Sequence, residues 1–398
     1  MEDEKTLDAK ASRIFKTFNS LSSLDNHVIL LKWLLQVAIQ RTNLKATVKS
    51  TRLISPEICF SEPELKMKST ATAGANIAFI KFWGVQEDSE AYGLHLPLND
   101  SISMTLDTAK TTTTIDFSLD YEKDSIIIDG QPASIAAFKR AIDHVERLRR
   151  LAGSRLKCKL VSKNTFPMGT GIASSASGFA ALTVAACSAL ELELTPRELS
   201  SWARLGSGSA TRSIFGGYVR WRVATTHHES YAEQILPEDK WRLADLVAIV
   251  STKHKKVTSK EGHLLAKSSP LLSGRLASLH ESIGRTQTAI VERDFPSLGE
   301  TMEQDALIMH SVMMTSFPPL LYWNGVSIDI MHKIHELRLQ EDLQCYFTLD
   351  AGPNVHIITL PEEAEAVKQR LQEEIDGIKQ IIVGYTGKGA ELQSEHLF

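Results

Sequence analysis

The first seventy residues have the hydrophobic pattern of helices. Five apolar residues in this stretch recur at helical spacing: Ile29, Leu30, Trp33, Leu34 and Val37. Ser55 and Pro56 then interrupt the pattern, as proline and small polar residues do at the end of a helix. Residues 1–70 are therefore predicted to form an added helical segment at the start of the chain.

From Lys66 onward, short β-branched runs replace the helical pattern. They occupy residues 101–106, 111–117 and 125–128, and Asp129-Gly130 provides a turn after the last run. Helical periodicity returns at 135–151 and at 174–190, the second of which is rich in alanine. We expect residues 71–250 to form a domain of strands and helices.

A second unit is predicted after about residue 250. Its pattern indicates helices at 271–292, 295–309, 327–341 and 362–376, and strands at 345–349, 355–360 and 378–383. Strands and helices alternate without a regular βαβ repeat, so the predicted fold class is α+β, with a second domain over 251–398.

Composition limits the classes of function. The 398 residues are 43% hydrophobic and 23% charged, with a net charge of -4, which gives no general attraction for nucleic acid or for an anionic membrane. The four cysteines are scattered without a CxxC pair, as expected for reduced thiols. The apolar stretch 28–39 is too short to span a bilayer. We therefore expect a cytoplasmic protein.

One segment has the chemistry of a phosphate-binding loop. Phe166 to Gly178 place glycines and small hydroxyl residues directly before the alanine-rich helix. Glycine lets the backbone approach a ligand closely, and the free N–H groups at a helix start attract phosphate. By itself the pattern is equally consistent with a tightly packed helix cap. No lysine follows, so it is not a P-loop.

Three charged residues stand in unusual surroundings. Lys81 lies in an apolar and aromatic run, where a lysine either reaches solvent or meets an anion. Arg212 follows small hydroxyl residues, and it either binds a carboxylate or phosphate or is a solvated loop residue. Asp350 ends a predicted strand before Gly352-Pro353, where a turn aspartate is the ordinary explanation.

Taken together, four segments resemble the diphosphomevalonate decarboxylase family of the GHMP kinase superfamily. They are NIAFIKFWG, FPMGTGIASSASGFAAL, GSGSATRSIFGGYVRW and FTLDAGPNVH, in the family's order and roughly at its spacing. The resemblance runs from about Thr70 to the C-terminus. It implies a GHMP-kinase-like two-domain fold and a carbon-carbon lyase of isoprenoid biosynthesis by the mevalonate pathway.

The resemblance also implies roles for individual residues. Asp350, Lys81 and Arg212 match the catalytic aspartate, lysine and arginine around the C3 oxygen and the carboxylate of the substrate. The residues that match substrate-binding positions are Asn76, Ser207, Ser209, Ser259 and Lys260. Those that match the phosphate loop are Gly169, Gly171, Ser174 and Ser175. We assign no metal site, and a homodimer is implied by resemblance alone.

The chain departs from the family pattern where the diphosphate end of the substrate is bound. The family usually has KYWGK, with a tyrosine and a second lysine, whereas this chain has Phe82 and Val85 at those positions. The family's serine-arginine pair corresponds to Ser259-Lys260. Lysine in place of arginine offers a single ammonium group instead of a guanidinium that can bind phosphate through two N–H donors. These changes predict a substrate with a monophosphate at C5.

The phosphate loop departs as well, with Met168 and Thr170 in place of smaller residues. We therefore expect the branch that converts mevalonate 3,5-bisphosphate to isopentenyl phosphate without ATP and without any cofactor. The alternative is an ATP- and Mg²⁺-dependent decarboxylase of 5-phosphomevalonate or 5-diphosphomevalonate. A non-catalytic binding protein with the same fold is a remote alternative. Phosphorylated mevalonate is the expected partner, and no nucleic acid or membrane is expected.

Overall fold

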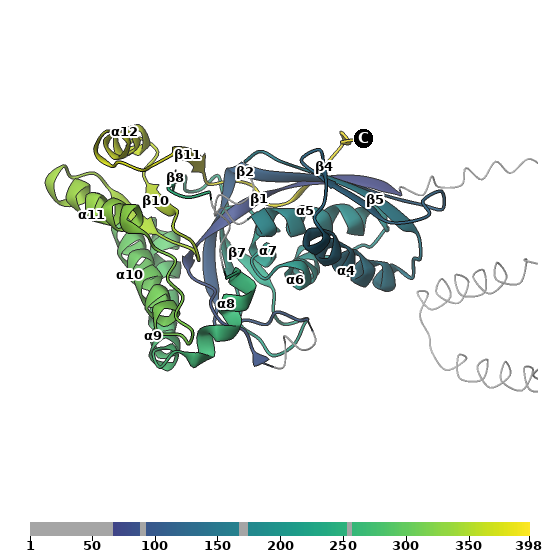
Figure 1. Cartoon of the computed structure of the whole chain (residues 1–398), viewed down its shortest axis with the longest axis horizontal. Helices are drawn as coiled ribbons and strands as arrows, with labels where there is room; N and C mark the ends of the chain where they lie inside the picture. The colour runs from purple at the N-terminus through teal and green to yellow at the C-terminus, as the bar shows by residue number, and fades with distance from the viewer. Residues whose placement is uncertain (1–66, 88–92, 167–173, 253–256) are drawn as a thin grey trace, which may run out of the picture. The chain divides into compact units, whose positions relative to one another are not determined.

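A long antiparallel strand pair forms the centre of the first of two sheets in the computed structural model (Figure 1). The structure describes residues 67–87, 93–166, 174–252 and 257–398. The predicted helical segment 1–70 lies almost entirely outside these residues. From Leu65 to Phe398 the chain forms one compact unit.

The first sheet has the order β12-β1-β2-β5-β3-β4, and β6 extends it by pairing with β2 and β7. Its strands are β1 (Lys68–Ile80), β2 (Ser101–Ser118), β3 (Ser125–Ile128), β4 (Gln131–Pro132), β5 (Lys157–Asn164), β6 (Tyr218–Trp221), β7 (Ala232–Leu236) and β12 (Glu391–Gln393). The two separate strands predicted at 101–106 and 111–117 are one strand, β2, because pairing with β1 resumes at Lys110 after a register shift that follows Thr105.

Helices cover one face of this sheet (Figure 1). They are α4 (Ile135–Ala152), α5 (Ser174–Ala189), α6 (Pro196–Gly206) and the short α7 (Ala210–Ser213). The alanines of α5 let its backbone lie close to β1 and β2, where Ala180, Ala181 and Ala185 are fully buried. A Thr195–Glu198 capping box and Pro196 start α6.

The second sheet has four antiparallel strands in the order β11-β8-β10-β9. They are β8 (Ala244–Ile249), β9 (Cys345–Thr348), β10 (Val355–Thr359) and β11 (Gln380–Tyr385). The helices that follow β8 are α8 (Ser259–Leu265), α9 (Leu272–Glu292), α10 (Phe295–Met314), α11 (Gly325–Gln340) and α12 (Ala364–Glu374), with the 3₁₀ turn η1 (Ala266–Ser268). Because β8 belongs to this sheet, the change of sheet falls just before the predicted boundary at residue 250.

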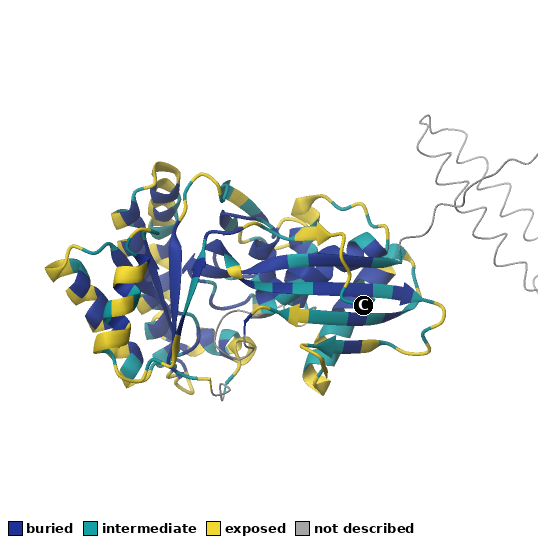
Figure 2. Cartoon of the chain, turned by 90° about the horizontal axis from the view of Figure 1, so that it is seen from above, coloured by how far each residue is buried: buried dark blue, intermediate teal, exposed yellow. Residues whose placement is uncertain are grey.

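Separate hydrophobic clusters hold the two sheets. One packs α5 on β1, β2 and β5, and another packs α11 and α12 on the second sheet. A third cluster joins Ile77 and Phe79 of β1 to residues of α9, α10 and β9. Figure 2 shows that the strands of both sheets consist largely of buried residues. The packing of α9 and α10 against the end of β1 therefore brings the two sheets together.

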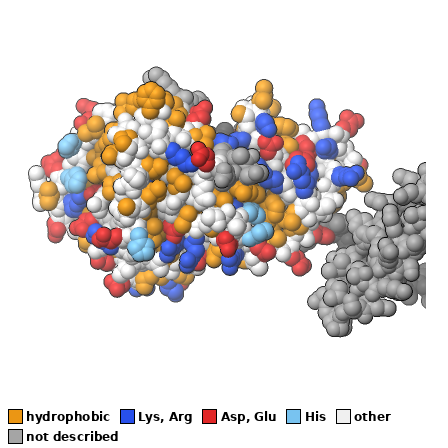
Figure 3. Space-filling view, turned by 90° about the horizontal axis from the view of Figure 1, so that it is seen from below, with side chains coloured by type: hydrophobic (Ala, Val, Ile, Leu, Met, Phe, Trp, Pro, Cys, Tyr) orange, Lys and Arg blue, Asp and Glu red, His pale blue; other side chains and the backbone are white. Residues whose placement is uncertain are grey.

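The described surface carries mixed charge. On the face seen in Figure 3, Lys and Arg side chains alternate with Asp and Glu side chains among hydrophobic ones. This mixture is consistent with the small net charge of -4. Within the residues that the structure describes, no helix has both the length and the hydropathy needed to cross a membrane. The α+β fold class predicted from the sequence is confirmed.

The buried imidazole of His144 predicts a dependence of stability on pH. His144 lies on α4, fully buried, and its Nε2 is 2.8 Å from Thr183 Oγ1 on α5. Burial lowers the pKa of His144 from 6.5 to about 3, and the charge of Arg147 adds to the shift. Between about pH 6.5 and pH 3, His144 is therefore protonated in the unfolded chain but neutral in the folded protein. Because the unfolded state binds more protons in this range, the free energy of unfolding decreases as pH falls.

Between pH 7 and pH 5 we expect His144 to remove about 2 kcal/mol from the free energy of unfolding. His144→Gln cannot titrate, so urea unfolding of this variant should lack that part of the pH dependence. His280→Gln, on the exposed side of α9, is the matched control and should follow the unsubstituted protein. Identical pH slopes for His144→Gln and the unsubstituted protein would contradict the assignment.

Candidate active site

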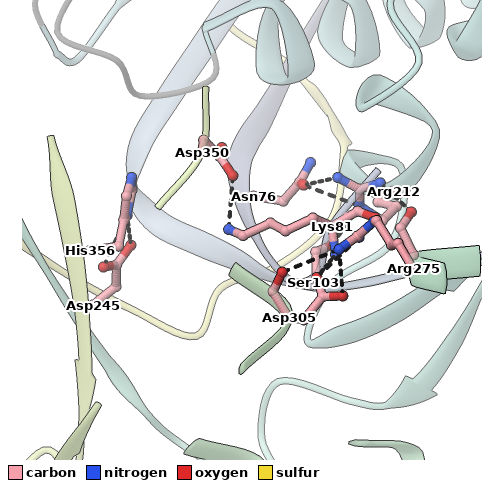
Figure 4. Close-up of polar contacts among 10 residues, drawn as sticks. Asn76, Lys81, Ser103, Arg212, Asp245, Arg275, Asp305, Asp350 and His356 are labelled. Atoms are coloured by element: carbon pink, nitrogen blue, oxygen red, sulfur yellow. Dashed lines mark hydrogen bonds and ion pairs between the residues drawn. The ribbon is translucent and has the colours of Figure 1, made fainter. Parts of the chain in front are cut away.

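Lys81 and Asp350 form an ion pair between the two sheets (Figure 4). Lys81 follows the last residue of β1, and Asp350 follows β9 by two residues. The Lys81 Nζ is 2.9 Å from Asp350 Oδ1. The lysine side chain is 2% exposed, whereas the aspartate side chain is 33% exposed. The pair therefore has a buried cation and a carboxylate that a small molecule can reach.

Arg212 lies beside this pair in a pocket of neutral oxygen atoms. It is on α7 and is 3% exposed. Its guanidinium donates to Asn76 Oδ1 at 3.0 Å, to Ser101 Oγ at 2.6 Å and to Ser103 Oγ at 2.9 Å. Burial lowers the pKa of Arg212 to about 10, and the nearby Asp350 carboxylate opposes part of that shift. The arginine is therefore a buried cation whose hydrogen bonds to Asn76, Ser101 and Ser103 all go to uncharged groups.

Asn76 fixes the position of α7 relative to β1. Its amide nitrogen donates to Ser213 Oγ at 2.8 Å and to the backbone carbonyl of Ser209 at 3.1 Å. Since its amide oxygen accepts from Arg212, a single side chain connects the strand, the α6–α7 loop and the guanidinium. Asn76 is 4% exposed, so in this structure it mainly orients its neighbours.

The hydroxyl residues of the α6–α7 loop lie next to the start of α5. Ser207 Oγ is 3.1 Å from Ser175 Oγ and 3.3 Å from Ser209 Oγ. Ser207 thus connects the predicted phosphate-loop residue Ser175 to Ser209, the other predicted substrate-binding serine of this loop. Ser174 is the first residue of α5, and Gly169 and Gly171 lie outside the described residues.

Phe82 and His263 form an aromatic wall next to this loop. The Phe82 ring packs on Trp221 with centroids 4.7 Å apart and on the His263 ring with centroids 4.2 Å apart. Gly208 lies so close that a Cβ there would be 2.8 Å from the Phe82 ring. The Gly84 N–H donates to His263 Nδ1 at 2.9 Å, which fixes this imidazole.

Ser259 and Lys260 lie in the exposed first turn of α8. The same helix contacts the site through Gly262, which packs on Trp83, and through His263. The substrate-binding roles of Ser259 and Lys260 stay predictions.

Three residues near the pair were not identified from the sequence: Arg275, Asp305 and His310. All three are buried, and Asp305 and His310 lie on α10. Burial lowers the pKa of His310 to about 3, and the charge of Lys81 adds to the shift, so this imidazole is neutral behind the pair. A signal was present: Asp305 falls on the apolar stripe of Met302, Ala306 and Met309, where an acid needs a partner.

Comparisons with known proteins agree with this geometry. Residues 73–232 match the diphosphomevalonate decarboxylase-like N-terminal domain, and residues 245–395 match the mevalonate 5-diphosphate decarboxylase C-terminal domain. A diphosphomevalonate decarboxylase of Aspergillus fumigatus is 37% identical over 75% of this chain and 78% of its own length. A phosphomevalonate decarboxylase of Haloferax volcanii is 31% identical over 83% of this chain and 100% of its own.

Solved structures show the same relationship. Mevalonate diphosphate decarboxylase from Staphylococcus aureus is 34% identical and superposes with a TM-score of 0.77, covering 82% of this chain and 98% of its own. The mevalonate diphosphate decarboxylase from Enterococcus faecalis, solved to describe ATP binding mediated by mevalonate diphosphate, is 35% identical. It superposes with a TM-score of 0.76 over 82% of this chain and 99% of its own. The chain therefore belongs to the diphosphomevalonate decarboxylase family and is an enzyme of the carbon-carbon lyase type.

Proposed function

We propose that this enzyme performs the ATP-dependent decarboxylation of mevalonate 5-phosphate to isopentenyl phosphate, with ADP, phosphate and carbon dioxide as the other products. The observation that carries the proposal is the Lys81–Asp350 pair beside Arg212. These are the three charged residues that the family resemblance implies for the reaction. The sequence alone favoured the ATP-free bisphosphate reaction, but the relatives support the ATP-dependent alternative better.

Arg212 is suited to hold the carboxylate that leaves as carbon dioxide. Its described hydrogen bonds all go to neutral oxygens, so its buried positive charge is only partly compensated. A guanidinium binds a carboxylate through two parallel N–H donors and with a strong preference over a neutral group. A substrate carboxylate at this position would supply the missing negative charge.

Asp350 and Lys81 are suited to the C3 oxygen. The exposed carboxylate of Asp350 can accept the proton of the C3 hydroxyl when that oxygen attacks phosphate. Asp350 is 33% exposed, so it can release this proton to solvent and become a carboxylate again. As the new phosphate then leaves, positive charge builds at C3, and the carboxylate stabilises it. Lys81, held 2.9 Å from Asp350, supplies positive charge for the departing phosphate. The two charges stabilise opposite ends of the bond that breaks.

ATP with Mg²⁺ supplies the phosphoryl group when bound, and the chain has features that fit it. The first turn of α5, where backbone N–H groups lack partners within the helix, lies beside the loop that contains Ser207, because Ser175 Oγ is 3.1 Å from Ser207 Oγ. An open hollow of about 550 Å³ lies beside Phe166, the last described residue before the predicted phosphate loop. It is lined by Asp129, Gly130, Val161, Ser162, Lys163, Asn164, Phe166 and Leu397.

The preference for a monophosphate rests on Phe82 and Val85. The family's tyrosine and lysine at these positions reach a terminal diphosphate, whereas the Phe82 ring has no hydroxyl and packs between Trp221 and His263. Val85 is 6% exposed and offers no charge. Similarity over the whole length of a phosphomevalonate decarboxylase also supports a monophosphate substrate.

The function is tested by incubating the pure enzyme with mevalonate 5-phosphate, mevalonate 5-diphosphate or mevalonate 3,5-bisphosphate, each with and without ATP and Mg²⁺. We expect carbon dioxide and isopentenyl phosphate from the 5-phosphate, and only with ATP. Product from the 3,5-bisphosphate without nucleotide, and none from the 5-phosphate with ATP, would replace the proposal with the ATP-free reaction.

Asp350→Asn should lower kcat by about 10³-fold, because the amide neither accepts the C3 proton nor stabilises positive charge. Product formation at saturating substrate measures the loss, and circular dichroism checks the fold. Asp342→Asn is the matched control, since Asp342 is exposed and its φ of 56° suits asparagine equally. Activity retained in Asp350→Asn would remove this carboxylate from the mechanism.

Phe82→Tyr should restore part of the contact to a diphosphate. A hydrogen bond to a charged phosphate contributes about 1.5 kcal/mol, so kcat/KM for the 5-diphosphate should rise about tenfold relative to the 5-phosphate. Phe215→Tyr adds the same hydroxyl to another ring of the same cluster and should leave this ratio unchanged. An unchanged ratio in Phe82→Tyr would show that the ring does not set the choice of phosphate.

A further inference from the structure

Lys81 is held at both its backbone and its ammonium group by residues from the second half of the chain. Its backbone N–H donates to Asp305 Oδ2 at 2.7 Å, and its backbone carbonyl accepts from Arg275 Nη2 at 3.1 Å. Asn99 Nδ2 donates to the same carbonyl at 3.0 Å. At the other end, the ammonium contacts Asp350. The position of the Nζ therefore depends on contacts at both ends of the residue.

Arg275 and Asp305 are themselves a buried ion pair. Arg275 on α9 is 2% exposed and Asp305 on α10 is 4% exposed, with Nη1 3.1 Å from Oδ1. Arg275 also donates to the Asp305 backbone carbonyl at 3.2 Å. Desolvation offsets most of the attraction in such a pair, so it adds little stability compared with apolar side chains of similar volume. A contribution to folding stability therefore does not by itself explain why the Arg275–Asp305 ion pair lies against the backbone of Lys81.

The pair lies on the elements that also position Asp350. Leu298 and Met302 of α10 pack on Tyr346 of β9, and Asp350 follows β9. Asp305 is on the same face of α10 and contacts Lys81 at the end of β1. Figure 4 shows Asp305 and Arg275 at the backbone end of Lys81 and Asp350 at its amine end. The pair thus ties the lysine to the unit that supplies its carboxylate partner.

We propose that Arg275 and Asp305 are positioning residues for the decarboxylation and act by fixing the backbone of Lys81. The inference rests on the proposed function for its activity measurement, because Lys81 must act in the reaction. Without the pair, the chain after β1 loses two of its three described backbone contacts at Lys81. A displacement of about 1 Å of a reacting group is enough to lower a rate about 10²-fold.

The test replaces both charges together, as Arg275→Met with Asp305→Leu. Apolar residues of similar volume in place of a buried pair are usually tolerated, so this double variant should fold. We expect kcat to fall about 30- to 100-fold, with KM within about threefold of the unsubstituted enzyme. Asp305→Asn combined with Arg275→Met buries no unpaired charge and keeps an oxygen acceptor for the Lys81 N–H, so it should recover most of the kcat lost in the Arg275→Met, Asp305→Leu variant.

The chain offers a closely matched control in Arg149 and Asp124. Arg149 is also 2% exposed, and Asp124 accepts a backbone N–H as well, that of Cys158 at 2.8 Å. This pair joins the end of α4 to the first sheet and makes no described contact with Lys81. Arg149→Met with Asp124→Leu should leave kcat per folded molecule unchanged, whatever it does to the melting temperature.

A folded Arg275→Met, Asp305→Leu variant with unchanged kcat would overturn the proposal, and so would an equal loss of kcat in the control. A crystal structure of the variant gives a measurement that is independent of activity. We expect the Lys81 Nζ to Asp350 Oδ1 distance to exceed about 3.5 Å, beyond hydrogen-bond range. A distance that stays near 2.9 Å would also overturn it. If the unsubstituted enzyme is inactive on all three substrates, the proposed function is wrong. The Lys81 Nζ to Asp350 Oδ1 distance in the variant would still decide whether Arg275 and Asp305 position Lys81.

Discussion

The ion pair between Lys81 and Asp350 is the constraint on which the site depends. A lysine side chain that is 2% exposed carries a costly buried charge unless a carboxylate neutralises it, and here that carboxylate comes from a distant part of the chain. The first sheet supplies the lysine at the end of β1, and the second supplies the aspartate after β9. The packing of α9 and α10 between these elements therefore serves the pair as well as the hydrophobic core.

The charges around this pair are distributed unequally. Lys81 has a carboxylate partner, whereas Arg212 donates to the neutral groups of Asn76, Ser101 and Ser103. A buried guanidinium in such surroundings favours an anion that enters from solution. The exposed side of Asp350 meets the opposite charge that develops at C3 in the proposed reaction. The site thus has a fixed cation for an anionic substrate and a reachable anion for a cationic transition state.

In the proposed function, the aromatic residues limit which substrate can use these charges. Phe82 packs between Trp221 and His263 and lies directly against Gly208 of the α6–α7 loop. A ring without a hydroxyl at this position removes a donor for a second phosphate but preserves the packing. Under the proposed function, the choice between a monophosphate and a diphosphate can therefore change at Phe82 while Lys81, Arg212 and Asp350 stay in place.

The sequence by itself determined the α+β class, most helices and strands, and the identity of the three charged residues, because periodicity and motifs are local properties. It left open whether Lys81 reaches solvent or meets an anion, and it gave no role to Arg275 or Asp305. Only the tertiary structure decided these points, since Lys81 and Asp350 are 269 positions apart and meet through the packing of two sheets. The long strand β2 was divided in the prediction because a register shift breaks the regular alternation of side chains. Contacts between distant segments depend on how complete elements pack, which no local pattern of residues specifies.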